Sequence, residues 1–210
     1  MKKNNKSRHS LKKNPPKRVL ILCEGLSEKI YVRGFCSEAK NRQSLHAVEI
    51  EVYQPKNYTP YGLLKTAKAK AQEAKRDGLP YDSIWIVFDK DEHARIPETF
   101  VESENEKVKI AFSVVCFETW ILLHFEKTSK HFMNCEKLIG YIKQKGYLNY
   151  EKTNYYEALS EEQKKNAIIN ASWLREQNKI YIEDGIQVFK LLAYTNFDEL
   201  ILYLSNIIRP

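Results

Sequence analysis

The chain has 210 residues, a length within the reach of one domain, and a compact chain of this size buries roughly 70% of its unfolded surface. Apolar residues make up 43% of the sequence and charged residues 29%, which are globular proportions and exclude a disordered chain. The formal net charge is +7, but eight basic residues and no acidic one lie in residues 1–18; without these eight, 26 of the 34 basic residues remain against 27 acidic ones. The folded part is therefore expected to be nearly neutral, which limits the case for a basic nucleic-acid-binding face on the fold.

Residues 1–18 form a polar, basic segment that two consecutive prolines interrupt. The fixed φ of proline prevents this segment from continuing as a helix, so we expect a flexible arm. Its basic side chains could clamp a phosphate backbone, or the segment could act only as a solubilising tail. The candidate nucleic-acid-binding residues of the arm are Lys12, Lys13, Lys17 and Arg18.

Short apolar segments alternate with helical patterns over residues 19–125. Residues 19–23 (VLILC) form a continuous apolar run, which is typical of a strand covered on both faces in a parallel sheet. The other expected strands are residues 47–53, 83–88 and 109–115, and the expected helices are residues 27–39, 62–76, 98–106 and 117–125. This alternation predicts an α/β fold with an open, mostly parallel sheet flanked by helices.

From residue 126 onward the apolar periodicity is helical. The expected helices there are residues 137–145, 157–177 and 196–208, with a possible strand only at residues 186–192. We therefore expect three parts: a flexible basic arm over residues 1–18, an α/β core over residues 19–125, and a helical extension over residues 126–210 that packs on the core.

The four cysteines are separated by 13, 80 and 19 positions, which matches no CxxC or zinc-ribbon pattern, and no apolar signal segment precedes the first of them. No apolar run approaches the roughly 18 residues that a membrane helix needs. We therefore expect a soluble protein in a reducing cytoplasm, one that needs neither a disulfide nor a metal ion to fold.

Three acidic residues directly follow two of the predicted strands. Glu24 comes after the first strand, and Asp89 and Asp91 come after the third. The functional crevice of an open parallel sheet lies at the carboxyl ends of its strands, where carboxylates from neighbouring loops can share one cation. A single acid at a strand end usually only ends the strand, so the grouping is what favours a site. A set of carboxylate oxygens suits Mg²⁺.

Three segments of the chain resemble the successive motifs of the RloB family, a bacterial phage-defence group with a Toprim-like fold. They are residues 23–28 (CEGLSE), 88–93 (FDKDEH) and 116–125 (CFETWILLHF), and the resemblance covers roughly residues 17–208. The chain departs from the family pattern at Val114-Val115, where the family usually has Asn-Pro, and at Thr119, where it has Leu. The first departure concerns the end of the fourth strand and so the placement of Glu118.

The resemblance implies a Toprim nuclease. In such enzymes the glutamate after the first strand takes part in general acid/base chemistry, and the paired aspartates hold a divalent metal ion. Carried onto this chain, the resemblance implies that Glu24 moves protons and that Asp89 and Asp91, together with Glu24, bind Mg²⁺ or Mn²⁺. It also implies a nucleic acid substrate, a role in antiviral defence by abortive infection, and an ATPase partner protein.

The remaining candidates also have structural interpretations. Glu118 is a catalytic candidate, but both it and Glu28 lie at predicted helix N-termini, where the helix dipole stabilises carboxylates. His93 could donate a proton to a scissile phosphate, although a histidine in a loop is more often solvated. The residues expected in the core are Trp120, Leu122 and Leu123.

Two other functions compete with the nuclease. The segment FDKD fits the aspartate-nucleophile phosphatases of the haloacid-dehalogenase type, but that fold places its DxD motif after the first strand, and here it follows the third. The alternative from a different class is a non-catalytic nucleic-acid-binding or partner-regulated module, which the basic arm would support. The sequence contains no P-loop, and it does not distinguish DNA from RNA as the substrate.

Overall fold

The computed structural model describes residues 16–38, 48–56, 59–91, 93–148 and 155–208. The described residues form an α/β fold around one sheet with the strand order β2-β1-β3-β4-β5. The strands are β1 (Lys17–Cys23), β2 (Val48–Tyr53), β3 (Ser83–Asp89), β4 (Lys109–Val114) and β5 (Tyr194–Thr195). The first four are parallel and β5 is antiparallel to β4. The predicted fold class is confirmed.

The continuous apolar run in β1 is explained by burial on both faces of the sheet. Val19, Ile21 and Cys23 pack into one hydrophobic cluster, and Leu20 and Leu22 pack into another on the opposite face. All five side chains are fully buried, as expected for a central strand between two helical layers.

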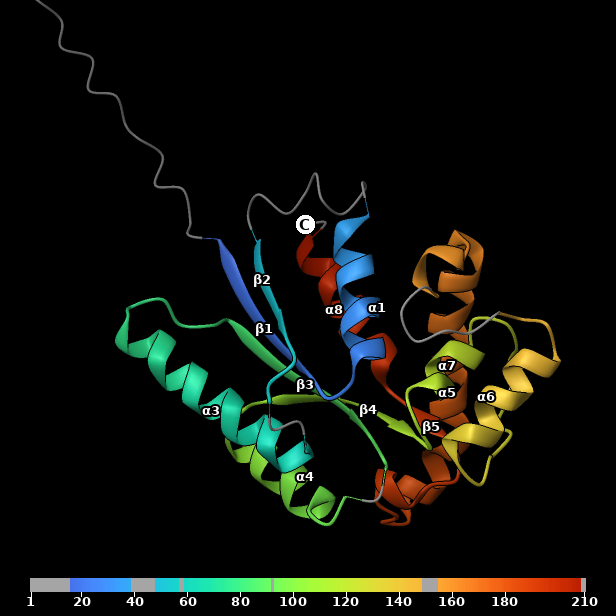
Figure 1. Ribbon diagram of the computed structural model, residues 1–210. Helices are drawn as coiled ribbons and strands as arrows, with labels where there is room; N and C mark the ends of the chain where they lie inside the picture. Colours follow the sequence, from blue (N-terminus) through green and yellow to red (C-terminus); the bar gives the residue numbers. More distant parts are fainter. Residues whose placement is uncertain (1–15, 39–47, 57–58, 92, 149–154, 209–210) are drawn as a thin grey trace, which may run out of the picture.

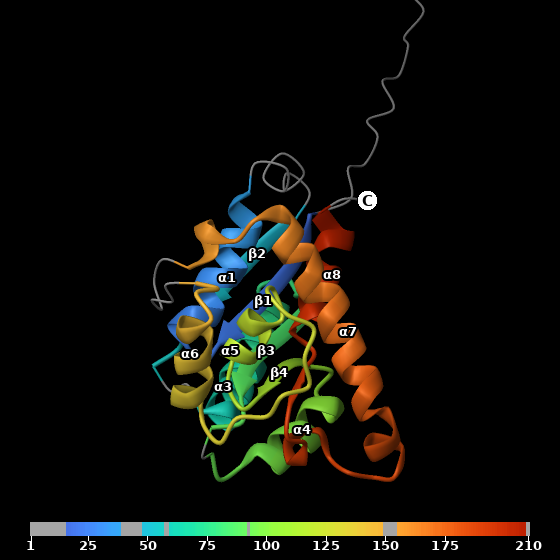
Figure 2. The same cartoon turned by 90° about the vertical axis from the view of Figure 1, so that its right-hand side faces the viewer.

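Helices cover both faces of the sheet (Figure 1). One layer holds α3 (Pro60–Arg76) and α4 (Ile96–Asn105), and α3 begins where Thr59 caps it through the Gly62 N–H and proline occupies the first helical position. The other layer holds α1 (Leu26–Ser37), α5 (Glu118–Leu122), α6 (Cys135–Gln144), α7 (Glu161–Glu183) and α8 (Phe197–Ile208). Figure 2 views the molecule from this second layer, with α5 between α6 and α7.

None of the helices in the described part of the chain has both the length and the apolar character to cross a membrane. The most apolar segment, around α5, is only five residues long and is buried inside the protein. Its residues Trp120, Leu122 and Leu123 are at most 2% exposed, so their prediction as core residues is confirmed.

The structure shifts one prediction for the C-terminal part and overturns another. The predicted helix over residues 157–177 is present as α7, but it starts four residues later because Ser160 and Gln163 form a capping box, and the short 3₁₀ helix η2 (Tyr156–Ala158) precedes it. The predicted strand over residues 186–192 contains the 3₁₀ helix η3 (Val188–Lys190) instead, and the strand β5 comes after it. The expected helical extension therefore also supplies an edge strand.

The predicted boundary between the arm and the core lies two residues too late. Lys17 and Arg18 are the first residues of β1, and the Arg18 side chain donates a hydrogen bond of 2.9 Å to Glu49 on β2. The backbone N–H of Arg18 also bonds to Asp82 at 2.7 Å. Arg18 is therefore held in the sheet rather than available in an arm. Lys12 and Lys13 lie outside the described residues.

Candidate functional site

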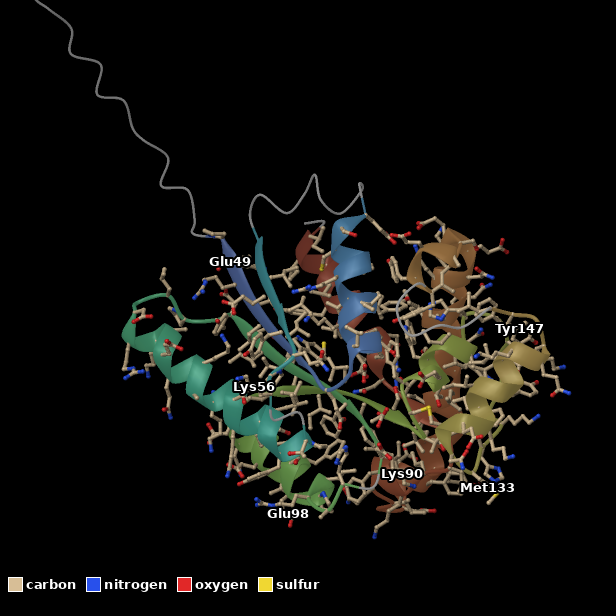
Figure 3. The ribbon with its side chains drawn as sticks, in the orientation of Figure 1. Glu49, Lys56, Lys90, Glu98, Met133 and Tyr147 are labelled. Carbon is tan, nitrogen blue, oxygen red and sulfur yellow. A yellow bond between two sulfur atoms is a disulfide. The ribbon has the colours of Figure 1, made fainter. Side chains whose placement is uncertain are left out.

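The loops after β1, β3 and β4 meet at the carboxyl edge of the sheet. β1 and β3 are adjacent and parallel, with Cys23 opposite Val87, so Glu24 leaves β1 beside the end of β3. The backbone N–H of Glu24 extends this pairing with a 2.9 Å bond to the Val87 carbonyl. Lys90, labelled in Figure 3, follows β3 at this edge. The strand register therefore brings the predicted acidic residues together.

Glu24 lies directly against the end of β3. Its Oε2 accepts a 3.4 Å hydrogen bond from the backbone N–H of Asp89, and its side chain is only 14% exposed. The other oxygen, Oε1, is 2.5 Å from Nε2 of His93, although the direction of this contact is not that of a ring N–H hydrogen bond. The structure thus places the His93 ring beside the Glu24 carboxyl group.

Asp89 is the residue that joins the three loops. Its Oδ1 accepts a hydrogen bond from the backbone N–H of Asp91 at 3.2 Å, and its Oδ2 accepts one from the backbone N–H of Phe117, also at 3.2 Å. Phe117 immediately precedes α5, so the turn after β4 is tied to the end of β3. Asp91 is exposed to solvent, and its charge raises the pKa of both Glu24 and Asp89.

Burial and mutual repulsion favour protonation of these carboxylates. The pKa of Glu24 is raised to about 9, first by burial and next by the charge of Asp89, with smaller effects from Glu28 and Asp91. The pKa of Asp89 is raised to about 6, mainly by burial, against the lowering effect of its two backbone N–H donors. Repelling carboxylates on buried strand ends are the electrostatic environment that a divalent cation would stabilise.

Glu28 belongs to this cluster more closely than its helix position alone predicted. It is 4% exposed, and a Cβ on Gly25 would lie only 2.3 Å from its Oε2, so the Glu28 carboxylate packs over the glycine backbone. Its charge raises the pKa of Glu24. The position four residues after Glu24, in the first turn of α1, was the available sequence signal, but the helix dipole explains a glutamate there equally well.

Glu118 is a buried carboxylate whose charge acts on Asp89. It is 3% exposed, and its charge contributes to the raised pKa of Asp89. Its Oε2 is 3.1 Å from Sγ of Cys135, and Cys135 forms a disulfide with Cys116. The fold therefore contains a disulfide, which the cysteine spacing did not predict. The sequence contained no sign of it because the two cysteines are 19 positions apart on different elements.

The oxygen atoms at the sheet edge fit a hard divalent cation. Glu24, Asp89 and Asp91 supply carboxylates from two adjacent loops, and Glu28 and Glu118 lie behind them. Mg²⁺ and Mn²⁺ prefer such oxygen ligands, whereas the sulfur atoms of Cys116 and Cys135 belong to a separate group with Glu118, whose ligand atoms lie within 4.8 Å of one another.

The third RloB-like segment also contains a histidine, and the structure places it in the core. His124 is 1% exposed, with Nε2 2.9 Å from the Tyr31 hydroxyl and Nδ1 2.9 Å from the Trp120 carbonyl. Burial lowers the pKa of His124 to about 4, so the ring is neutral at pH 7 and connects α5 to α1. These contacts give His124 a packing role in the core.

Comparison with known proteins gives a single kind of match. No curated protein and no solved structure matches the chain significantly. A family model described as RloB-like protein matches residues 19–204, which include all three segments that carry the carboxylate cluster. The chain therefore belongs to the RloB-like protein family.

Proposed function

We propose that this chain is a Mg²⁺- or Mn²⁺-dependent nuclease that hydrolyses a phosphodiester bond of DNA or RNA. The observation that carries the proposal is the contact between Glu24 and the end of β3, where burial and the charge of Asp89 raise the pKa of Glu24 at the carboxyl edge of a parallel sheet. Strongly shifted acids grouped at such an edge are typical of catalytic sites.

Each residue of the cluster has a role in this proposal. Asp89 and Asp91 would hold the metal ion with Glu24, and the bound ion would polarise a phosphoryl oxygen and offset the charge that develops in the reaction. In the metal-free protein the pKa of Glu24 is raised to about 9; binding of the cation would release this proton, and the ionised Glu24 carboxylate could then accept a proton during cleavage. His93, 2.5 Å from Glu24, can exchange the proton with solvent.

The family resemblance supports a proposal for the biological setting. The RloB resemblance implies a phage-defence role, and we propose that the nuclease works there together with an ATPase partner. Such a partner would supply the ATP-binding site, since the sequence of this chain contains no P-loop.

One observation favours a second candidate, a nucleic-acid-binding module without catalysis. Both carboxylate oxygens of Asp89 already accept backbone N–H hydrogen bonds, from Asp91 and from Phe117. These bonds would suffice to stabilise the end of β3 without any metal ion. The two candidates differ in what Asp91 does, because Asp91 is exposed and its substitution removes a charge without opening a cavity.

The substitution Asp91→Asn tests the proposal. Mn²⁺ binding is measured by calorimetry on the isolated chain, and cleavage is measured with the proposed ATPase partner present. We expect at least a tenfold loss of Mn²⁺ affinity and a loss of cleavage of at least 10²-fold, on the order of what one electrostatic catalytic group contributes. The matched control is Asp77→Asn, an exposed aspartate that follows α3, which should change neither quantity. Retained cleavage by a folded Asp91→Asn protein would assign the site to the binding module.

A further inference from the structure

The disulfide ties the turn after β4 to the start of α6. Cys116 lies between β4 and α5, Cys135 is the first residue of α6, and their Cα atoms are 5.7 Å apart. Cys116 is 5% exposed, whereas Cys135 is half-buried. Cys135 is therefore the more exposed residue of the pair.

This bond lies next to the residues that hold Asp89. The residue after Cys116 is Phe117, whose backbone N–H bonds to Oδ2 of Asp89 at 3.2 Å. The next residue is Glu118, whose Oε2 is 3.1 Å from the sulfur of Cys135. A change in the bond between Cys116 and Cys135 therefore acts on the same short turn that supports the carboxylate cluster.

The other two cysteines, Cys23 and Cys36, are poorly placed to react with a small disulfide. Burial raises the pKa of the Cys36 thiol to about 12, and the Cys23 side chain is fully buried inside β1. The thiolate is the reactive form of cysteine, so neither group reacts readily at neutral pH. Cys116 and Cys135 are thus the pair in this chain that is placed for thiol–disulfide exchange.

The reduced pair also has a defined partner. When the disulfide opens, the Cys135 thiol can donate its proton to the Glu118 carboxylate at the observed separation of 3.1 Å. The Glu118 carboxylate would then form a hydrogen bond that it does not form with the oxidised pair, in which the sulfur carries no proton. In the reducing compartment that the sequence predicts, a disulfide is typically transient and redox-sensing rather than structural.

We infer that Cys116 and Cys135 form a reversible thiol–disulfide pair that sets the position of Glu118 and of the Phe117 N–H, and through them the affinity of the carboxylate cluster for a divalent cation. The part that concerns the cation rests on the proposed function; the pair itself does not.

The oxidant in this inference is a low-molecular-weight disulfide. The Cys135 thiolate attacks it and releases one small thiolate, and the Cys116 thiolate then displaces the second by attacking the Cys135 sulfur. The protein loses two electrons and two protons, and the small disulfide gains them as two thiols. Reduction by a small thiol runs through the same mixed disulfide on Cys135 in the opposite direction.

The first test counts thiols in the full chain. After oxidised glutathione, two fewer thiols should react under denaturing conditions than after a phosphine reductant, and digestion should yield a linked peptide pair containing residues 116 and 135. The melting temperature of the reduced protein should be lower by roughly 5–10 °C, the effect of opening a loop of this size. Cys135→Ser should abolish both differences, whereas Cys36→Ala should keep them. Four reactive thiols after oxidation would overturn the inference.

The second test measures Mn²⁺ binding to the oxidised and reduced wild-type chain by calorimetry. We expect the two dissociation constants to differ at least fivefold, and the difference to disappear in Cys135→Ser. Equal affinities in the two states would overturn the coupling while leaving the nuclease proposal intact. Absence of Mn²⁺ binding in both states would overturn the nuclease proposal and the coupling, but not the disulfide pair itself. One tightly bound Zn²⁺ in the reduced chain, absent from Cys135→Ser, would replace the redox role with a structural metal site.

Discussion

Glu24 combines burial and charge repulsion in one side chain. It is 14% exposed and lies beside Asp89, so its pKa of about 9 is far above that of a glutamate in water. Between pH 4.5 and pH 9 the folded protein keeps a proton on Glu24 that the unfolded chain releases. Because the folded state binds more protons there, its stability decreases as the pH rises through this window.

Replacing Glu24 with glutamine should remove this pH dependence. In the metal-free wild-type protein, the Glu24 contribution should lower the free energy of unfolding by up to about 1.4 kcal/mol for each pH unit between about pH 6 and pH 9. The comparison is made by urea denaturation at several pH values. Glu98→Gln, at an exposed position in α4, serves as the control and should keep the wild-type slope. An identical slope in Glu24→Gln would show that Glu24 is ionised in the folded protein.

Asp89 adds to the same dependence over a more acidic range. Its pKa of about 6, against 3.8 for an ordinary aspartate, means that its contribution to stability is present below pH 3.8 and disappears as the pH rises to 6. Added Mn²⁺ should oppose both effects, because a bound cation stabilises the ionised carboxylates and releases their protons.

At the level of elements, α1 is held by the segment that carries η2. The Tyr155 hydroxyl donates a hydrogen bond to the Ser27 carbonyl, and the Tyr156 ring packs directly on the backbone of Gly34. A Cβ on Gly34 would lie 2.3 Å from Cδ1 of Tyr156. The position of α1, and with it Glu28, therefore depends on the absence of a side chain at residue 34.

Two glycine-to-alanine substitutions in helices distinguish the effect of the Tyr156 contact on stability from the effect of helix propensity. Gly34→Ala should destabilise the protein by roughly 1–3 kcal/mol, because a rigid ring must move to admit the methyl group. Gly140→Ala in α6 has nothing within 4 Å of its new Cβ and should stabilise the protein by about 0.5–1 kcal/mol. Urea denaturation of both variants measures the difference. Equal stabilisation by both would mean that Tyr156 moves aside at little cost.

The elements also show which local patterns were sufficient for prediction. β1 and β3 were predictable because a strand buried on both faces requires a continuous apolar run, and both segments have one. The two-residue strand β5 was not, because Tyr194–Thr195 is extended only through its pairing with the end of β4. A segment this short has no periodicity of its own.

Over the whole molecule, charge is unevenly distributed along the chain. Six of the 34 basic residues lie in residues 1–15, ahead of β1, whereas Arg18 is engaged by Glu49 inside the sheet. Nucleic acid binding by the nearly neutral remainder would therefore depend on these first residues for contacts to phosphate groups.

Deletion of residues 1–15 should separate binding from folding. The melting temperature should stay nearly unchanged, while affinity for duplex DNA falls and its dependence on salt flattens by up to about 0.9 log units for each phosphate group that the protein no longer neutralises. Binding is measured by fluorescence anisotropy at several salt concentrations. A control that keeps the length but replaces the six basic residues with glutamine should behave like the deletion. An unchanged salt slope would reduce the segment to a solubilising tail.

The proximity of Glu24 and Asp89 could be predicted from the chain alone, because each follows a buried run and the ends of adjacent parallel strands share one edge. The raised pKa of Glu24, the packing of Glu28 over Gly25 and the bond between Cys116 and Cys135 could not. These features arise where segments distant in sequence exclude water together, and the positions of their side chains depend on the packing of the whole core.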